Sequence, residues 1–217
     1  MQMRFLLAFA ALTFSSVAFA SEDDANLPSD IFQIHYASNL NIGDSYVNIT
    51  NSGATTNQIQ PTGNDPVVGT SQNLCANVYT FDPAEELIAC CTCSVTPNGL
   101  QSLSVVKSLI SNPLTPAIPS AVVIKIVATT GTCNASAVTP NALARGLLAW
   151  GTTLHQNTST ATPSYAVTET PFSQAALTFA ELTHITSTCG FIQADGSGFG
   201  ICGGCPANGL GAGTSIQ

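Results

Sequence analysis

Half of the chain's eight cysteines lie in one short stretch, and this cluster constrains the fold more than any other feature. The stretch runs from Leu74 to Pro97 and reads LCANVYTFDPAEELIACCTCSVTP. Two runs of β-forming residues flank Asp82-Pro83-Ala84-Glu85, a sequence typical of a tight turn. The pattern predicts a β-hairpin around which the rest of the chain packs.

The alternation of side chains along a strand decides which cysteines of the hairpin share a face. Cys91 and Cys93 are expected on one face of the second strand and Cys90 on the other. If the turn is centred near Pro83, Cys75 lies opposite Cys91, within one register step of Cys90 or Cys93. We therefore expect a cross-strand disulfide from Cys75, with its partner left open, and bridges from the remaining two cysteines to distant parts of the chain.

The other cysteines lie in a loop over residues 131–140 and in the last thirty residues of the chain. Cys189 is expected to pair with Cys202 or Cys205, and a local Cys202–Cys205 bridge would close a strained small ring. A metal site built from the CCxC cluster and Cys202-Gly-Gly-Cys205 is the alternative. Structural zinc sites usually use two C-x-x-C knuckles, and an oxidising compartment favours disulfides. We predict no metal or cofactor and eight disulfide cysteines: Cys75, Cys90, Cys91, Cys93, Cys133, Cys189, Cys202 and Cys205.

Residues 1–20 have the pattern of a secretory signal peptide. Arg4 precedes an apolar run, and small residues stand at Ala18 and Ala20. The apolar run is too short to span a bilayer, and no later stretch is long and apolar enough. The sequence therefore predicts a secreted or cell-surface protein without a membrane span in the mature chain, built as one domain over residues 21–217.

Charged residues are scarce, at 7% of the chain, against about 25% in typical globular domains. Beyond the predicted leader the only basic residues are Lys107, Lys125 and Arg145, and the net charge of the chain is −8. Negative charge disfavours nucleic acid and anionic membranes as partners. A surface of Ser, Thr, Asn, Gln and Gly requires little desolvation when it is buried against a second copy, which favours self-association.

Short β-forming segments separated by turns predict an antiparallel β-sandwich. Residues 121–129 form the most apolar segment, which we expect to be buried on both faces. This segment and the hairpin over residues 74–95 are the expected central strands. Asn51-Ser52-Gly53 predicts a turn, followed by a long loop over residues 54–69. Residues 142–155 are ambiguous, with a first half that fits a helix. The other expected strands are residues 31–36, 45–50, 100–106 and 165–168.

One helix is expected near the C-terminus. Thr178-Phe-Ala-Glu181 is a capping box, and Gly190 is expected to end the helix. Its apolar face would consist of Phe179, Leu182, Ile185 and Cys189. The predicted fold is thus a mainly β, disulfide-stapled sandwich with one short C-terminal helix and a Gly/Cys-rich tail, together spanning residues 178–217.

The sequence contains no motif of a catalytic or nucleotide-binding site, and we predict no enzymatic activity. The histidines are His35, His155 and His184, and we expect structural roles for them. A glycosidase pair could be drawn from Asp82, Glu85 or Glu86, but these residues crowd a turn where solvated charge is usual. Three N-x-[ST] triplets begin at Asn48, Asn134 and Asn157 and matter only in a host that glycosylates them.

Three blocks of the chain resemble a group of uncharacterised exported bacterial proteins. They are NLCANVYTFDPAEELIACCTCSVTPNGLQSLSV, AWGTTLH and GSGFGICGGC. The resemblance implies a bacterial, exported setting and carries no activity and no site residues.

These observations lead to one main functional hypothesis and two alternatives. The main one is a secreted structural subunit of an extracellular filament, pilus-like fibre or surface layer. In one version of it, the N-terminal extension over residues 21–50 is exchanged between subunits, and residues 27–50 add as a strand to a neighbour. The first alternative is a monomeric adhesion module that binds glycan or another surface ligand on exposed Tyr36, Tyr79, Trp150 and Tyr165. The second is a hydrolase with a site assembled from scattered acids and histidines.

Overall fold

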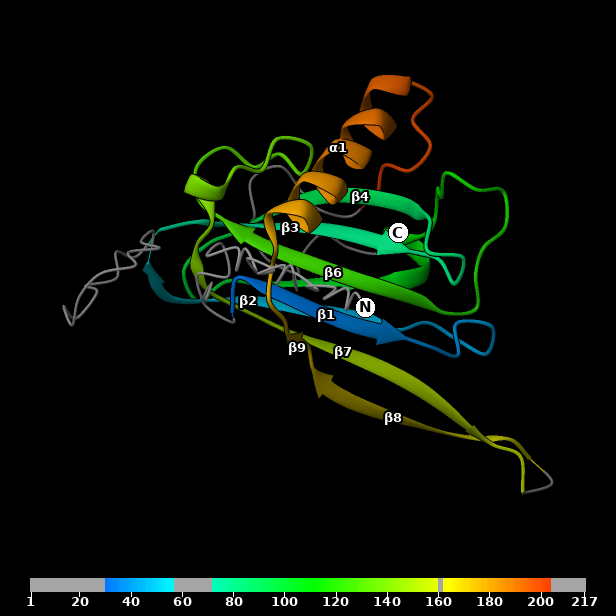
Figure 1. The fold of residues 1–217 in the computed structure, drawn as a ribbon. Helices are drawn as coiled ribbons and strands as arrows, with labels where there is room; N and C mark the ends of the chain where they lie inside the picture. The colour runs from blue at the N-terminus through cyan, green and yellow to red at the C-terminus, as the bar shows by residue number, and fades with distance from the viewer. Residues whose placement is uncertain (1–29, 57–71, 160–161, 204–217) are drawn as a thin grey trace, which may run out of the picture.

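The computed structural model describes residues 30–56, 72–159 and 162–203. In these residues two antiparallel sheets are stacked, and one helix covers the outer side of the first sheet (Figure 1). The predicted leader, residues 57–69 of the predicted loop, and most of the glycine-rich tail with Cys205 lie outside the described residues. The predicted fold class, a mainly β antiparallel sandwich with one C-terminal helix, is confirmed.

The two sheets have simple strand orders. Sheet one has the order β4-β3-β6-β1-β9 and sheet two the order β5-β2-β7-β8. Sheet one contains β1 (Phe32–Ala37), β3 (Leu74–Phe81), β4 (Leu87–Val95), β6 (Val122–Thr129) and β9 (Ser173–Gln174). Sheet two contains β2 (Tyr46–Thr56), β5 (Leu100–Ser104), β7 (Arg145–Asn157) and β8 (Ser164–Pro171). A π-helical turn (Val105–Leu109), a 3-10 turn (Pro140–Ala142) and the helix α1 (Phe179–Asp195) complete the described elements.

Strand β6 contributes to both cores of the molecule, as its largely apolar sequence predicts. Ile124 and Ile126 belong to the core between the two sheets. Val127 belongs to the core between sheet one and α1, and Val123 packs against that core. Lys125 lies on the same outer face and pairs with Glu181 of α1 (Nζ to Oε1, 2.5 Å). Because side chains alternate between the two faces of β6, this strand packs against sheet two on one side and against α1 on the other.

The predicted hairpin exists as β3 and β4, but its register differs from the expected one. Cys75 lies opposite Ser94, not Cys91, because the pairing shifts by one residue at Phe81 and the turn is centred past Pro83. The expected central position holds for β3, whereas β4 is an edge strand. The predicted cross-strand disulfide from Cys75 is therefore wrong, and Cys75 is bonded to Cys133 outside the hairpin.

Each disulfide that the structure places joins the hairpin to a distant segment. They are Cys75–Cys133, Cys90–Cys189 and Cys91–Cys202, with Cα–Cα distances of 5.2, 5.9 and 5.4 Å. Cys93 is also disulfide-bonded. The proposed Cys189–Cys202, Cys189–Cys205 and Cys202–Cys205 bridges are wrong, since Cys189 and Cys202 both bond to β4.

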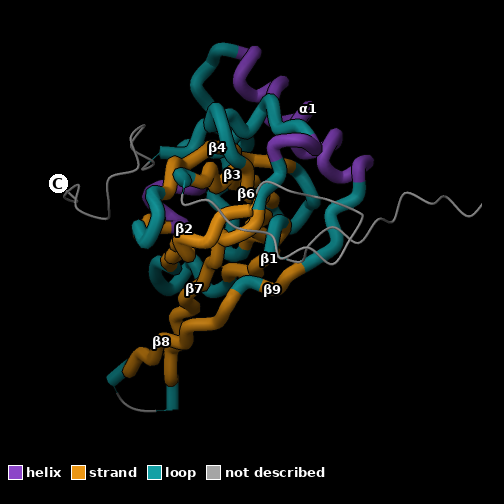
Figure 2. The backbone as a smooth tube through the Cα atoms, turned by 90° about the vertical axis from the view of Figure 1, so that its left-hand side faces the viewer, coloured by secondary structure: helices purple, strands orange, loops and turns teal. Residues whose placement is uncertain are grey.

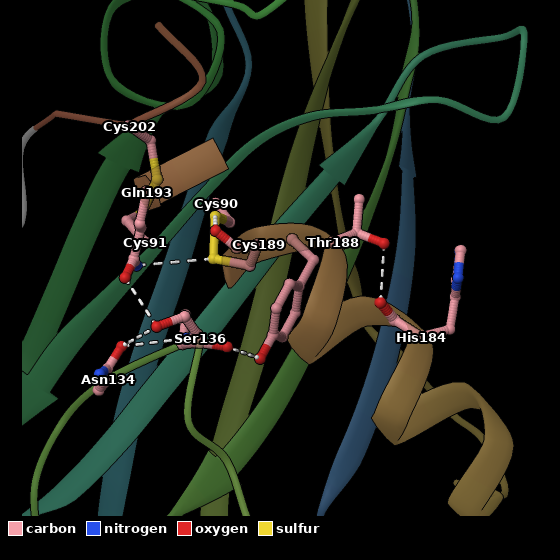
Figure 3. Close-up of a disulfide and its surroundings, with 11 residues drawn as sticks. Cys90, Cys91, Asn134, Ser136, His184, Thr188, Cys189, Gln193 and Cys202 are labelled. Carbon is pink, nitrogen blue, oxygen red and sulfur yellow. Dashed lines mark hydrogen bonds between the residues drawn. A yellow bond between two sulfur atoms is a disulfide. The ribbon is translucent and has the colours of Figure 1, made fainter. Parts of the chain in front are cut away.

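The two neighbouring cysteines of β4 hold two different elements. Cys90 points to the helix layer and bonds to Cys189 of α1, while Cys91 packs against the core between the sheets and bonds to Cys202 (Figure 3). The opposite faces predicted for these residues are thus confirmed. Ser136, from the loop that holds Cys133, adds a hydrogen bond to Gln193 of α1 (2.7 Å).

The helix begins as predicted and ends later than predicted. Thr178 is the N-cap, and its hydroxyl accepts a hydrogen bond from the Glu181 amide (3.1 Å). The expected stop at Gly190 is wrong, because the helix continues to Asp195 and ends at Gly196 in the left-handed conformation (φ 68°). Phe179 is exposed rather than buried, and Ile192 completes the buried face instead.

Two strands extend beyond their predicted bounds. The turn expected at residues 51–53 is part of β2, which passes through a register irregularity between Asn51 and Thr56, and Gly53 has a positive φ of 79°. The ambiguous residues 142–155 are mostly strand, with a 3-10 turn up to Ala142 and β7 from Arg145. Among the described residues, no helix combines the length and apolar character needed to cross a bilayer.

Amide side chains connect the two sheets where charged residues are scarce. Gln33 of β1 donates to the Leu147 carbonyl of β7 (2.7 Å) and accepts from the Ala149 amide (3.2 Å). Asn51 of β2 donates to the Val95 carbonyl of β4 (3.0 Å). These buried bonds satisfy polar groups without the desolvation cost of an ion pair.

Candidate functional site

Strand β8 is exposed along its whole length and forms a hairpin with β7, which we call the arm. Figures 1 and 2 show it projecting from the sandwich, away from the side that α1 covers. All eight residues of β8 are exposed, and β8 is the last strand of sheet two. The arm is therefore a two-stranded ribbon whose outer edge faces solvent in the described part of the chain.

Along this edge the backbone of β8 presents hydrogen-bonding groups that have no partner among the described residues. The Phe172 amide donates to the Ala149 carbonyl (2.9 Å), and the β7–β8 pairing continues from there without a shift. In an antiparallel pair, hydrogen-bonded positions recur at every second residue. The N–H and C=O groups of Tyr165, Val167 and Glu169 therefore point away from β7. Pro171 is the next outward position and has no N–H to offer.

The side chains of the β8 edge do little to keep another strand away. Tyr165 and Val167 are 56% and 63% exposed. Glu169 is the only charged residue of β8, and Asn48 of β2 donates to its carboxylate across the outer face of sheet two (3.2 Å). Soluble proteins usually protect an edge strand with Lys, a bulge or a covering segment. None of these protects β8 within the described residues.

The edge of sheet one at β4 is protected. The Cys90 amide donates to the Gly200 carbonyl (2.9 Å), and the Cys90 carbonyl accepts from the Cys202 amide (3.3 Å). The Ile88 carbonyl accepts from the Leu114 amide (2.8 Å). The Cys91–Cys202 disulfide holds this covering segment in place. At the other edge of sheet one, β9 has only two residues. The β4 edge of sheet one is thus covered by other residues of the chain, whereas the β8 edge of sheet two is open in the described residues.

The sequence indicated only part of this edge. It predicted a short strand over residues 165–168, and β8 spans Ser164–Pro171. The alternation of Tyr165 and Val167 between Pro163 and Pro171 is the signal that marks the full strand. Its place at the edge of a sheet depends on the order of distant strands, which local periodicity does not contain.

The aromatic residues expected to form a ligand platform are divided among different environments. Tyr79 is buried, and its hydroxyl donates to the Ala135 carbonyl (2.7 Å), so its expected exposure is wrong. Burial also raises the pKa of Tyr79. Tyr36 and Tyr165 are exposed, on β1 and β8. Trp150 is half-buried on β7, opposite Asn48 and Pro171.

Some of the acids and histidines come together beside α1. Asp82, Glu85 and His184 line a cavity of about 300 Å³ together with Phe81, Val123, Lys125 and Glu181. Lys125 lies 4.5 Å from the centre of the Phe81 ring and is paired with Glu181. One Asp82 oxygen accepts from the amides of Ala84 and Glu86 (both 2.9 Å). These contacts give the charged groups roles in the turn and in holding α1.

The remaining candidate residues lie elsewhere. His155 is on the arm, 2.9 Å from the Thr168 hydroxyl, and Glu86 is exposed at the hairpin turn. Asn134 and Asn157 accept from the amides of Ser136 and Ser159 (both 3.0 Å) in local turns. Among the described residues, no cluster of His, Cys, Asp or Glu has a metal-binding arrangement.

His35 is buried between the sheets at the root of the arm. Its ring stacks on Phe172 with centroids 4.7 Å apart, and its Nε2 atom has no hydrogen-bond partner in the described part of the chain. Burial lowers the pKa of His35 from its ordinary value of 6.5, because the charged ring would be poorly solvated there.

The lowered pKa of His35 predicts a pH-dependent stability. The unfolded chain takes up a proton at His35 more readily than the folded chain, so this contribution is complete above pH 6.5 and is lost as the pH falls below that value. We expect urea unfolding of the wild type at pH 5 and pH 8 to show a larger loss at pH 5 than that of His35→Leu, which has no titrating group. Equal losses in the two proteins would contradict this role for His35.

A scan against protein-family models, a search of curated proteins and a search of solved structures each found no match to this chain.

Proposed function

We propose that this protein is a secreted structural subunit that self-associates outside the cell into a filament, pilus-like fibre or surface layer, and that β8 is a contact strand. The observation that carries the proposal is the open edge of β8, with all eight residues exposed on a projecting arm. Three outward backbone positions are available to pair with a strand of another chain.

The composition of the chain supports association through this edge. Backbone hydrogen bonds would give the new strand pair its register, and Tyr165 and Val167 would add apolar contact. Little charge has to be desolvated, since Glu169 is the only charged residue of β8. In a monomer, this open edge would be free to pair with any other exposed strand. A specific contact with a second subunit would prevent such uncontrolled pairing.

The disulfides support an extracellular setting for the proposal. The three bridges that the structure places, together with bonded Cys93, suit an oxidising compartment. The proposal includes export through the predicted leader and no catalytic role. Exchange of the N-terminal residues 21–50 between subunits stays a prediction, and in the structure β1 and most of β2 pair within the same chain.

A proline at Val167 tests the proposal. Val167 directs its N–H away from β7, so Val167→Pro removes an outward donor without removing a β7–β8 hydrogen bond. We expect wild-type protein to form oligomers in multi-angle light scattering and the variant to be mainly monomeric. Circular dichroism and thermal unfolding of the variant should match the wild type, because the cores are untouched.

Val167→Thr is the matched control for the proline variant. It keeps the outward N–H and a β-branched side chain, so it should retain assembly. A wild type that stays monomeric on concentration, or a folded Val167→Pro variant that assembles like the wild type, would contradict the proposal.

A monomeric glycan-binding module is a second candidate, favoured by the outer face of sheet two. Trp150 is partly exposed there beside Asn48, which is hydrogen-bonded to Ser102 (2.8 Å) and Glu169 (3.2 Å). An aromatic ring flanked by amide, hydroxyl and carboxylate groups suits a sugar, which presents both C–H and O–H groups. A monomer that is stable to dilution would favour this candidate over the filament.

A further inference from the structure

We infer that β8 of one copy pairs with β5 of the next copy, so that sheet two continues from subunit to subunit in an open head-to-tail polymer. This inference rests on the proposed function and names the second contact strand. Strands β5 and β8 are the two opposite edges of the same four-stranded sheet. The edge at β4, by contrast, is already hydrogen-bonded to residues of its own chain.

The directions of the two edge strands fit this arrangement. Each neighbouring pair in sheet two is antiparallel, so β5 and β8, separated by two strands, run in opposite directions. A second copy related by translation along the sheet therefore places its β5 antiparallel to β8 of the first. The antiparallel pattern then continues without a break, and no subunit has to be inverted.

The outward groups of β5 match those of β8. The Val105 amide donates to the Ser45 carbonyl (2.7 Å), which places the inward hydrogen bonds of β5 at every second residue from there. The backbone groups of Leu100 and Ser102 therefore point away from β2. At Ser104 only the N–H is left for pairing, because this residue is the N-cap of the π-helical turn and its carbonyl accepts the first hydrogen bond of that turn. Both edges thus offer outward residues at a spacing of two.

The faces of the sheet also agree. Ser102 lies on the outer face of sheet two, where its hydroxyl donates to Asn48, and Glu169 reaches the same face through Asn48. Hydrogen-bonded partners in an antiparallel pair direct their side chains to the same face. Pairing Val167 of one copy with Ser102 of the next therefore keeps the outer face continuous. Strand β5 contains no charged residue to oppose Glu169.

Pairing between two β8 strands is the competing arrangement. A two-fold β8–β8 contact would form a closed dimer and leave both β5 edges open to further pairing. The β8–β5 contact uses both exposed edges of sheet two in every subunit except those at the ends. This full use of the edges favours the head-to-tail arrangement.

Mixing two blocked variants separates these arrangements. Val167→Pro blocks β8 and leaves β5 open, whereas Ser102→Pro blocks β5 at an outward N–H and leaves β8 open. We expect each variant alone to be monomeric and an equimolar mixture to form a dimer that grows no further. The full-length mature protein is used, with masses from light scattering and native mass spectrometry. Leu100→Pro, at the first residue of β5, is a second blocking variant if Ser102→Pro does not fold.

Each result of the mixing experiment points to one conclusion. Dimers of Ser102→Pro alone, with Val167→Pro left monomeric in the mixture, would overturn the β8–β5 pairing in favour of β8–β8 contact and keep the proposed function. Assembly of both single variants at wild-type levels would overturn both edges as contacts. Wild-type protein that remains monomeric would overturn the proposed function itself.

Discussion

Replacing both Cys90 and Cys189 by alanine is expected to lower the free energy of unfolding by about 2–5 kcal/mol. The bridge closes a sequence separation of 99 residues between β4 and α1. Long closed loops remove much conformational freedom from the unfolded chain. At about 2–4 °C per kcal/mol for a chain of this size, the melting temperature should fall by roughly 5–20 °C.

The location of the bridge predicts which part of the molecule loosens. Helix α1 packs on sheet one through Leu182, Ile185 and Ile192, and its polar links include the Lys125–Glu181 pair and the Ser136–Gln193 hydrogen bond. Without the bridge, amide hydrogen exchange should speed up in α1 and stay slow in β2 and β7 of sheet two. The matched control is the Cys75 and Cys133 double alanine variant, which should leave α1 protected. Unchanged exchange in α1 would contradict the assignment of this bridge.

The hairpin shows how far local sequence determines this fold. Both strands and the turn at Asp82 follow from β-propensity and turn chemistry. The register does not follow, because the turn is centred at Ala84 and the pairing shifts by one more residue at Phe81, which together move the residue opposite Cys75 from Cys91 to Ser94. Pairing over separations of 58, 99 and 111 residues depends on how the layers stack, which no local pattern contains.

In the helix and the arm, too, local sequence determines some features and tertiary packing determines the others. The capping box determines where α1 starts, whereas its end depends on whether Gly190 is tolerated inside the helix and whether Gly196 can close it. Packing of Ile192 into the core under the helix offsets the glycine's low helix propensity. For the candidate site, the alternation in β8 is visible in the sequence. That β8 ends a sheet, while residues 200–202 cover the edge of β4, emerges only from the assembled topology.

The close packing at the root of the arm leads to the second large expected effect. Gly151 lies on β7 between Val47 of β2 and Thr170 of β8. A Cβ atom on Gly151 would lie 2.1 Å from Nε2 of His35, far inside van der Waals contact. His35 is held between this backbone and the ring of Phe172, so it has little freedom to move away.

Gly151→Ala is therefore expected to destabilise the fold by about 1–3 kcal/mol through overpacking. His35→Ala makes room for the added methyl group, so the double variant should be more stable than the sum of the two single changes by about 0.5–3 kcal/mol. Gly203→Ala is the matched control, since a Cβ there meets nothing within 4 Å. Urea unfolding of the four variants and the wild type measures each term.

Gly151→Ala is also expected to affect assembly, because the packing around Gly151 holds the arm in place. His35, Phe172 and Gly151 join β1 of sheet one, the chain between β8 and β9, and β7 at the point where the arm leaves the sandwich. If His35 must move, the Phe172 contact that fixes the end of β8 moves with it, and the outward groups of β8 lose their fixed direction. Gly151→Ala should then weaken assembly as well as stability, and His35→Ala should partly restore both. Additive effects of the two substitutions on stability would show that the ring and the glycine are not in contact.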